Sequence, residues 1–176
     1  MVNSMVIEKL RRIKLLLLDV DGVMTDGGII YNDHGEETKK FNCRDGLGLR
    51  LLMDAGINVG IVTGRKSGVL MHRCKNLGIS LIFDGIIEKG KVLEPILRQT
   101  RIDSEEIAFM GDDLVDLPLM KKVGLAITVA DAHEIVLEHA HLITSAKGGA
   151  GAVREVCESI LKAKGLWDKI IGHFLQ

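Results

Sequence analysis

The feature that most constrains this chain is the apolar run Leu15–Leu18, which ends directly in Asp19-Val20-Asp21. Four successive leucines are typical of a strand that is buried on both faces of a sheet. A carboxylate is costly to bury, so both acids belong where the strand leaves the core. Residues two apart in an extended chain point the same way, and we therefore expect Asp19 and Asp21 to face one spot at the sheet edge.

Apolar runs recur along the chain and alternate with amphipathic stretches. The apolar runs predict short strands at residues 14–20, 57–63, 81–85, 106–112, 125–129 and 141–144. The stretches between them predict helices at residues 46–56, 67–78, 91–100, 115–124 and 132–140. This alternation predicts an α/β, three-layer Rossmann-like fold, in which helices cover both faces of a central parallel sheet. With 176 residues, the chain is expected to form a single domain over 1–176.

Two segments depart from this alternation. Residues 27–42 hold two extended pieces around an Asn-Asp-His-Gly turn, which predicts a β-hairpin inserted after the first strand. The tail, at about residues 164–176, spaces its apolar residues as one face of a helix. That spacing fits packing on the chain's own core and packing on a neighbouring subunit equally well.

Composition excludes several classes of protein. The 23 basic and 24 acidic residues give a net charge of −1, which argues against a protein that binds nucleic acid through bulk charge. No apolar run is long enough to cross a membrane. The three cysteines are scattered, with no disulfide framework or paired metal motif, so we expect a reducing cytoplasmic location.

Further polar groups follow later predicted strands. They are Thr63, a lysine near position 89, and the acidic cluster Asp112, Asp113 and Asp116. Ligands bind at the carboxyl edge of an open parallel sheet, so these groups are expected to meet Asp19 and Asp21 there. Clustered carboxylates without histidine or cysteine suit Mg²⁺. Together with a threonine and a lysine, they fit phosphoryl transfer to a carboxylate nucleophile.

Four segments carry a family resemblance: "LLLLDVDGVMTDGG", "IVTGR", the lysine after Asp84-Gly85, and "MGDDLVDLP". They resemble the four motifs of the haloacid dehalogenase (HAD) phosphatase superfamily. The segments "KKFNCRDGLGLRLL" and "GGAGAVRE" extend the likeness over about residues 10–160. Within the superfamily the chain is most similar to the capless phosphatases of 3-deoxy-D-manno-octulosonate 8-phosphate (KDO 8-phosphate). The resemblance implies a HAD-type fold and a Mg²⁺-dependent phosphomonoesterase that makes KDO for lipopolysaccharide.

The resemblance also implies roles for the catalytic and phosphate-binding groups. Asp19 would attack the phosphorus and form an aspartyl-phosphate. Asp21 would protonate the departing sugar oxygen and then activate the hydrolytic water. Thr63 and Lys89 would bind the transferring phosphoryl group. Lys91 is the other candidate lysine, and Lys89 is preferred because it fits the family's spacing from Asp84-Gly85.

A second implied set of residues holds the metal. Mg²⁺ would take a side-chain oxygen of Asp19, the backbone carbonyl of Asp21 and a side-chain oxygen of Asp112. Asp113 and Asp116 would orient the metal shell or the lysine. The similar family also implies a homotetramer whose hairpins help to close neighbouring sites.

Arginines are the expected ligands for the carboxylate of an α-keto sugar acid, because a guanidinium binds a carboxylate through paired donors. Arg65 stands at the start of the helix predicted over 67–78, and Arg73 lies eight residues further on, so the two are expected to share one helix face. Arg44 is a third candidate. The same arginines would serve a nonulosonate 9-phosphate of the sialic acid type, so a phosphatase for that substrate is the alternative.

Two interpretations from other classes explain less of the sequence. A phosphorelay receiver domain also combines acids, a threonine and a lysine, but its acceptor aspartate ends a later strand. It leaves the hairpin and the 111–116 cluster unexplained. A catalytically inactive binding subunit is not favoured, because every candidate catalytic group is present.

Overall fold

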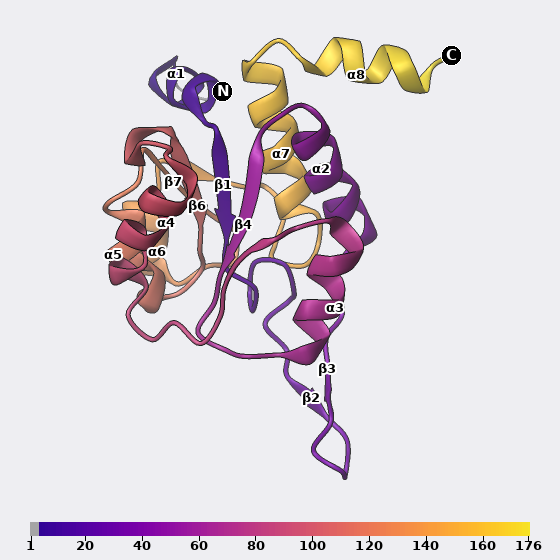
Figure 1. The fold of residues 1–176 in the computed structure, drawn as a ribbon, viewed down its shortest axis with the longest axis vertical. Helices are drawn as coiled ribbons and strands as arrows, with labels where there is room; N and C mark the ends of the chain where they lie inside the picture. The colour runs from indigo at the N-terminus through magenta and orange to yellow at the C-terminus, as the bar shows by residue number, and fades with distance from the viewer. Residues whose placement is uncertain (1–3) are drawn as a thin grey trace.

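The computed structural model describes residues 4–176, and its centre is a parallel sheet. Within this range the sheet has six strands in the order β5-β4-β1-β6-β7-β8. Figure 1 shows β1 beside β4. The strands are β1 (Leu15–Leu18), β4 (Asn58–Val62), β5 (Leu81–Phe83), β6 (Ile107–Met110), β7 (Leu125–Thr128) and β8 (Leu142–Ile143). Each lies within one of the predicted apolar runs, so the predicted α/β fold is confirmed.

The leucine strand β1 is central. It pairs in parallel with β4 on one side and β6 on the other, with Leu18 in register with Ile61 and Met110. All four leucines are fully buried. Leu16 and Leu18 pack into one hydrophobic cluster and Leu15 and Leu17 into another, because successive side chains of a strand point to opposite faces. The all-leucine run is thus explained by a strand with a core on each side.

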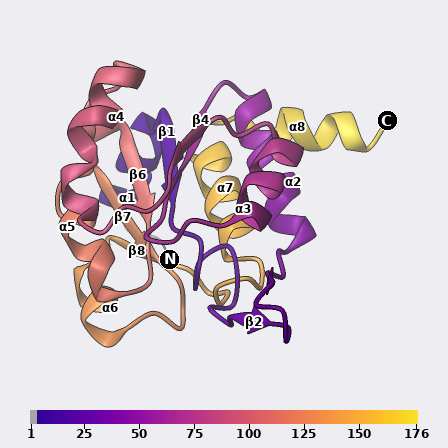
Figure 2. The same cartoon turned by 60° about the horizontal axis from the view of Figure 1, so that its bottom comes forward.

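Helices form the two outer layers (Figure 2). One face carries α1 (Ser4–Arg12), α2 (Cys43–Asp54), α3 (Gly68–Leu77) and α7 (Ala152–Ala163). The other carries α4 (Leu93–Thr100), α5 (Leu117–Met120) and α6 (Glu134–His139). Among these helices and α8 (Trp167–Phe174), none combines the length and the apolar character that a membrane crossing requires.

The helices differ from the predicted ones in three details. The helix α1 lies in a segment for which the sequence predicted none. The predicted helix at 115–124 contains a 3₁₀ turn, Leu114–Asp116, followed by the four-residue α5. Pro118 lies in the first turn of α5, where its missing N–H is tolerated. The helix α3 begins only after its N-cap Ser67, so Arg65 precedes it.

The inserted hairpin and the tail both project from the body (Figure 1). The hairpin consists of two short antiparallel strands, β2 (Ile30–Tyr31) and β3 (Glu37–Thr38), joined by a turn with Gly35 at positive φ. In the tail helix α8, Trp167 and Ile170 pack against the chain's own core. Phe174 and Leu175, at its end, are largely exposed.

Candidate active site

Asp19 and Asp21 stand immediately beyond the end of β1. The backbone N–H of Asp19 still donates to the Met110 carbonyl at 2.9 Å, which fixes this residue at the end of the parallel ladder. Asp19 is buried, whereas Asp21 is half-buried. Desolvation, with the charge of Asp116, outweighs the attraction of Lys89 and raises the pKa of Asp19 to about 6.

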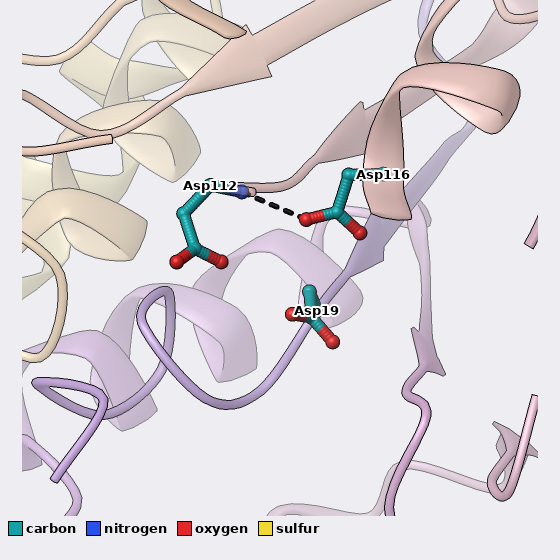
Figure 3. Close-up of side chains that lie close together, drawn as sticks. All are labelled: Asp19, Asp112 and Asp116. Carbon is teal, nitrogen blue, oxygen red and sulfur yellow. Dashed lines mark hydrogen bonds between the residues drawn. The ribbon is translucent and has the colours of Figure 1, made fainter. Parts of the chain in front are cut away.

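Two more carboxylates reach the same place from the end of β6. Asp112 and Asp116 point toward Asp19 in Figure 3, and one carboxylate oxygen from each of the three lies within 4.8 Å of the others. Burial, together with the charges of Asp19 and Asp116, raises the pKa of Asp112 to about 8. The Asp112 Oδ1 atom is buried without a hydrogen-bond partner in residues 4–176. A hard divalent cation would offset the repulsion between these carboxylates and would give Asp112 Oδ1 a partner.

Asp116 is already committed to other partners. Its Oδ2 accepts the backbone N–H groups of Asp112 at 2.9 Å and Asp113 at 3.1 Å (the first is dashed in Figure 3). Its Oδ1 accepts from Lys89 Nζ at 2.5 Å. Both Asp116 oxygens are therefore occupied by protein donors. Asp19 uses Oδ1 for Lys89, and Asp112 Oδ1 has no partner among residues 4–176.

Two close backbone contacts shape the space around Asp112. A Cβ at Gly22, which has φ +90°, would lie 2.0 Å from Asp112 Oδ2. A Cβ at Gly148 would lie 1.8 Å from the Gly22 carbonyl oxygen. The Gly149 N–H also donates to the Val23 carbonyl at 3.0 Å. The glycine-rich segment before α7 therefore packs directly on the turn that follows Asp21.

The structure separates the two candidate lysines. Lys89 is buried, and its Nζ lies 2.8 Å from Asp19 Oδ1. Burial lowers the pKa of Lys89, but the charges of Asp19 and Asp116 outweigh it and raise the pKa above its ordinary value. The Lys91 side chain is 79% exposed and pairs with Glu88. Of these two lysines, Lys89 is the one that contacts the carboxylates of Asp19 and Asp116.

Thr63 follows β4 and is buried at the base of the same pocket. Its Oγ1 accepts the Arg65 backbone N–H at 3.4 Å, which shapes the loop before α3. The pocket has a volume of about 330 Å³, a size suited to a small ligand. Its polar lining includes Asp19, Asp21, Thr63, Arg65, Lys89, Asp112 and Asp113.

The three candidate substrate arginines lie in different surroundings. Arg65 lines the pocket, and its Nη2 donates to Tyr31 Oη at 2.8 Å and to Glu37 Oε1 at 3.1 Å. Arg73 instead donates to the Asn42 carbonyl at 3.1 Å and lies over the Phe41 ring. The expectation that Arg65 and Arg73 share a helix face is wrong, because α3 begins after Arg65.

Arg44, the third candidate, is exposed at the start of α2. Neither Arg44 nor Arg73 is among the pocket-lining residues that the structure describes. Asp113, by contrast, lines the pocket. Its Oδ1 accepts the Leu114 N–H at 2.7 Å and caps the 3₁₀ turn that carries Asp116.

Sequence reasoning missed two charged residues of the hairpin. Lys39 Nζ contacts the Asp21 carboxylate and lies 3.3 Å from Glu37 Oε1. Glu37 also accepts from Ser67 Oγ at 2.6 Å. The only sequence signal for this network is the unusual placement of charged residues in a short hairpin, which does not identify their partners.

Comparison with known proteins agrees with this geometry. Residues 79–156 match the model of a haloacid dehalogenase-like hydrolase. A sheet with β1 at its centre, Asp19 and Asp21 beyond β1, and Lys89 and Asp112 beside them define a hydrolase of the HAD superfamily.

Full-length relatives give the family within that class. The chain is 45% identical, over 98% of its length and 92% of the relative's, to the 3-deoxy-D-manno-octulosonate 8-phosphate phosphatase KdsC of Escherichia coli K12. It is 46% identical, over 95% and 88%, to the phosphatase of the same name from Yersinia pestis. The chain belongs to the family of KDO 8-phosphate phosphatases, so the predicted resemblance is confirmed.

Solved structures support the same assignment. The Moraxella catarrhalis KDO 8-phosphate phosphatase, determined with a magnesium ion, a phosphate ion and KDO, superposes with a TM-score of 0.94 at 43% identity. That match covers 96% of this chain and 97% of the other. A probable phosphatase from Pseudomonas syringae gives a TM-score of 0.97 at 41% identity and covers 99% of both chains.

Proposed function

We propose that this protein hydrolyses KDO 8-phosphate to KDO and inorganic phosphate, through an aspartyl-phosphate and with Mg²⁺ as cofactor. The observation that carries the proposal is the convergence of Asp19, Asp112, Thr63 and Lys89 on one pocket. The named relatives and the Moraxella complex with magnesium, phosphate and KDO support the choice of substrate and metal. The product would serve lipopolysaccharide precursor synthesis.

In this mechanism Asp19 is the nucleophile, and Asp21 is the general acid and then the general base. Asp19 attacks phosphorus, and the bond from phosphorus to the sugar oxygen breaks while Asp21 gives that oxygen a proton. A water then attacks the aspartyl-phosphate, Asp21 takes its proton, and phosphate leaves with Asp19 regenerated. The raised pKa of Asp19, about 6, still leaves its carboxylate largely ionised at neutral pH.

Lys89 and Thr63 bind the phosphoryl oxygens. The Lys89 ammonium lies 2.8 Å from Asp19 Oδ1, so a phosphoryl group on Asp19 would be within its reach. Asp116 fixes the other side of this ammonium at 2.5 Å. A pre-positioned cation stabilises the charge that develops on the transferring group without reorganising during the reaction.

The residues present fit a resident Mg²⁺. Asp19 and Asp112 would hold it with side-chain oxygens, and Asp21 with its backbone carbonyl. The unpartnered Asp112 Oδ1 is the atom most in need of such a ligand. When bound, the ion would neutralise the carboxylates and polarise the phosphoryl group.

Arg65 is the arginine best placed to bind the substrate carboxylate, because it lines the pocket and two hairpin residues orient it.

The hairpin exposes Ile29, Ile30 and Tyr31, and these apolar side chains support a homotetramer in which hairpins contact neighbouring subunits. Free Cys43, Cys74 and Cys157 support a cytoplasmic location. Sedimentation of the purified protein tests the tetramer, which a monomeric mass would contradict.

A phosphate-release screen tests the function. Protein with Mg²⁺ is assayed on KDO 8-phosphate, a sialic acid 9-phosphate and common hexose phosphates. The proposal expects the highest kcat/KM for KDO 8-phosphate, and preference for the 9-phosphate would select the alternative function. Asp19→Asn and Asp21→Asn should both abolish turnover, whereas only Asp21→Asn should allow a phosphorylated Asp19 to be trapped. Absence of phosphate release from every substrate would refute an enzymatic role.

A further inference from the structure

Lys39 is a buried cation that the proposed chemistry leaves without a role. It follows β3 at the base of the hairpin, and only 2% of its side chain is exposed. An ammonium in such a place is stable only when it is paired, and loss of one partner of a buried pair is strongly destabilising. Its partners are Asp21 Oδ1 and, at 3.3 Å, Glu37 Oε1.

The contact with Lys39 sets the direction of the Asp21 side chain. Lys39 takes Oδ1, whereas Oδ2 lies 3.6 Å from Arg65 Nε, beyond hydrogen-bond distance. Asp21 is therefore tied to the hairpin through Oδ1, and it lines the same pocket as Asp19 and Asp112. Oδ2 is the oxygen that remains able to exchange a proton with a bound substrate.

Lys39 is itself fixed by a second anchor. Glu37 accepts from Ser67 Oγ at 2.6 Å and from Arg65 Nη2 at 3.1 Å, and Ser67 is the N-cap of α3. The base of the hairpin is thereby joined to the segment that runs from Thr63 to α3. Lys39 thus holds Asp21 from a rigid support.

We propose that Lys39 is a positioning residue for Asp21, and that it holds Oδ1 so that Oδ2 faces the oxygen of the departing alcohol. The proposal rests on the proposed function of Asp21 as proton donor. Lys39 touches neither substrate nor metal in this scheme, and it acts through the orientation of Asp21 alone.

The test exploits the leaving group. A sugar alkoxide needs a proton to depart, whereas p-nitrophenolate departs without one. In the first turnover, measured by rapid quench with enzyme in excess, Lys39→Met should release KDO from KDO 8-phosphate about tenfold or more slowly than wild type, as loss of an aligned general acid requires. Release of p-nitrophenol from p-nitrophenyl phosphate in the same turnover should change by less than about twofold.

Two further variants serve as the positive and the negative control. Asp21→Asn should show the same selectivity in a stronger form. Lys40→Met alters the exposed neighbouring lysine and should match wild type on both substrates. Lys39→Gln replaces Lys39→Met if the latter does not fold. The rates of KDO release and p-nitrophenol release are measured within one preparation. A lower fraction of folded enzyme lowers both rates equally, so it cannot change their ratio.

Equal losses on both substrates, or no loss on either, would overturn the role of Lys39 while leaving the proposed function intact. If wild-type protein fails to act on KDO 8-phosphate, the proposed substrate is wrong. The Lys39 comparison is then made with whichever alkyl phosphate the wild type hydrolyses, so the two failures are distinguishable.

Discussion

Gly22 and Asp112 are packed so closely that a Cβ on residue 22 would lie 2.0 Å from Asp112 Oδ2. Gly22→Ala is therefore expected to displace the Asp112 carboxylate and to abolish Mg²⁺ binding and turnover. Positive φ adds about 1 to 2 kcal/mol of strain for a residue with a Cβ. The measurements are kcat and Mg²⁺ titration calorimetry.

Gly27→Ala is the matched control for that substitution. Gly27 has a similar φ of +80°, but the nearest atom to an added Cβ is 3.7 Å away. It should lose a comparable amount of stability and keep its Mg²⁺ affinity. Similar metal affinity in both variants would show that the clash with Asp112 is not important.

Magnesium affinity should rise with pH. Burial, with the charges of Asp19 and Asp116, raises the pKa of Asp112 to about 8. Below that pH a proton competes with the metal for the carboxylate, so the affinity should fall about tenfold per pH unit. Titration calorimetry from about pH 6 to pH 9 measures this dependence. A dissociation constant that is constant over this range would contradict the prediction.

The same carboxyl should make the metal-free protein less stable as pH rises. The pKa of Asp112 is higher in the folded state, about 8, than the ordinary value of 3.8. Its contribution to stability is thus fully present below about pH 4 and is lost as pH rises through about 8. Mg²⁺ should therefore raise Tm more at about pH 8.5 than at pH 6, and Asp112→Asn should remove this difference.

Asp116→Asn should destabilise the fold as well as the site. The change leaves the buried Lys89 with one anionic partner fewer, and breaking a buried ion pair costs about 3 to 5 kcal/mol. Urea denaturation measures the loss, and kcat should fall because Lys89 is no longer fixed. Lys91→Met breaks an exposed pair with Glu88 and should leave stability and kcat nearly unchanged. Equal effects of the two variants would refute the role given to Asp116.

Arg65→Ala should weaken binding of a sugar acid phosphate. Arg65 lines the pocket, so its loss should raise KM for KDO 8-phosphate by about tenfold, as for one charged hydrogen bond. Arg44→Ala, at an exposed position away from the pocket, should leave KM unchanged. A larger effect of Arg44→Ala would point to a substrate site different from the one described.

The strands could be predicted from the sequence because each is a short apolar run, and the four central strands β1, β4, β6 and β7 are almost wholly buried. The acids could be predicted because parallel strands share one carboxyl edge, which brings Asp19 and Asp112 together. The contacts of Lys39 and Arg73 could not be predicted. They depend on how the hairpin and α3 pack against each other, and neither the hydrophobic periodicity nor the spacing of motifs predicts such contacts.

The central position of β1 also bears on when the pocket can assemble during synthesis. The strand is made early, but its two neighbours begin at Asn58 and Ile107. Asp19 therefore emerges from the ribosome long before Asp112, and the turn after it waits longer still for Gly148. The pocket around Asp19 and Asp112 can therefore take its final shape only after Gly148 has left the exit tunnel.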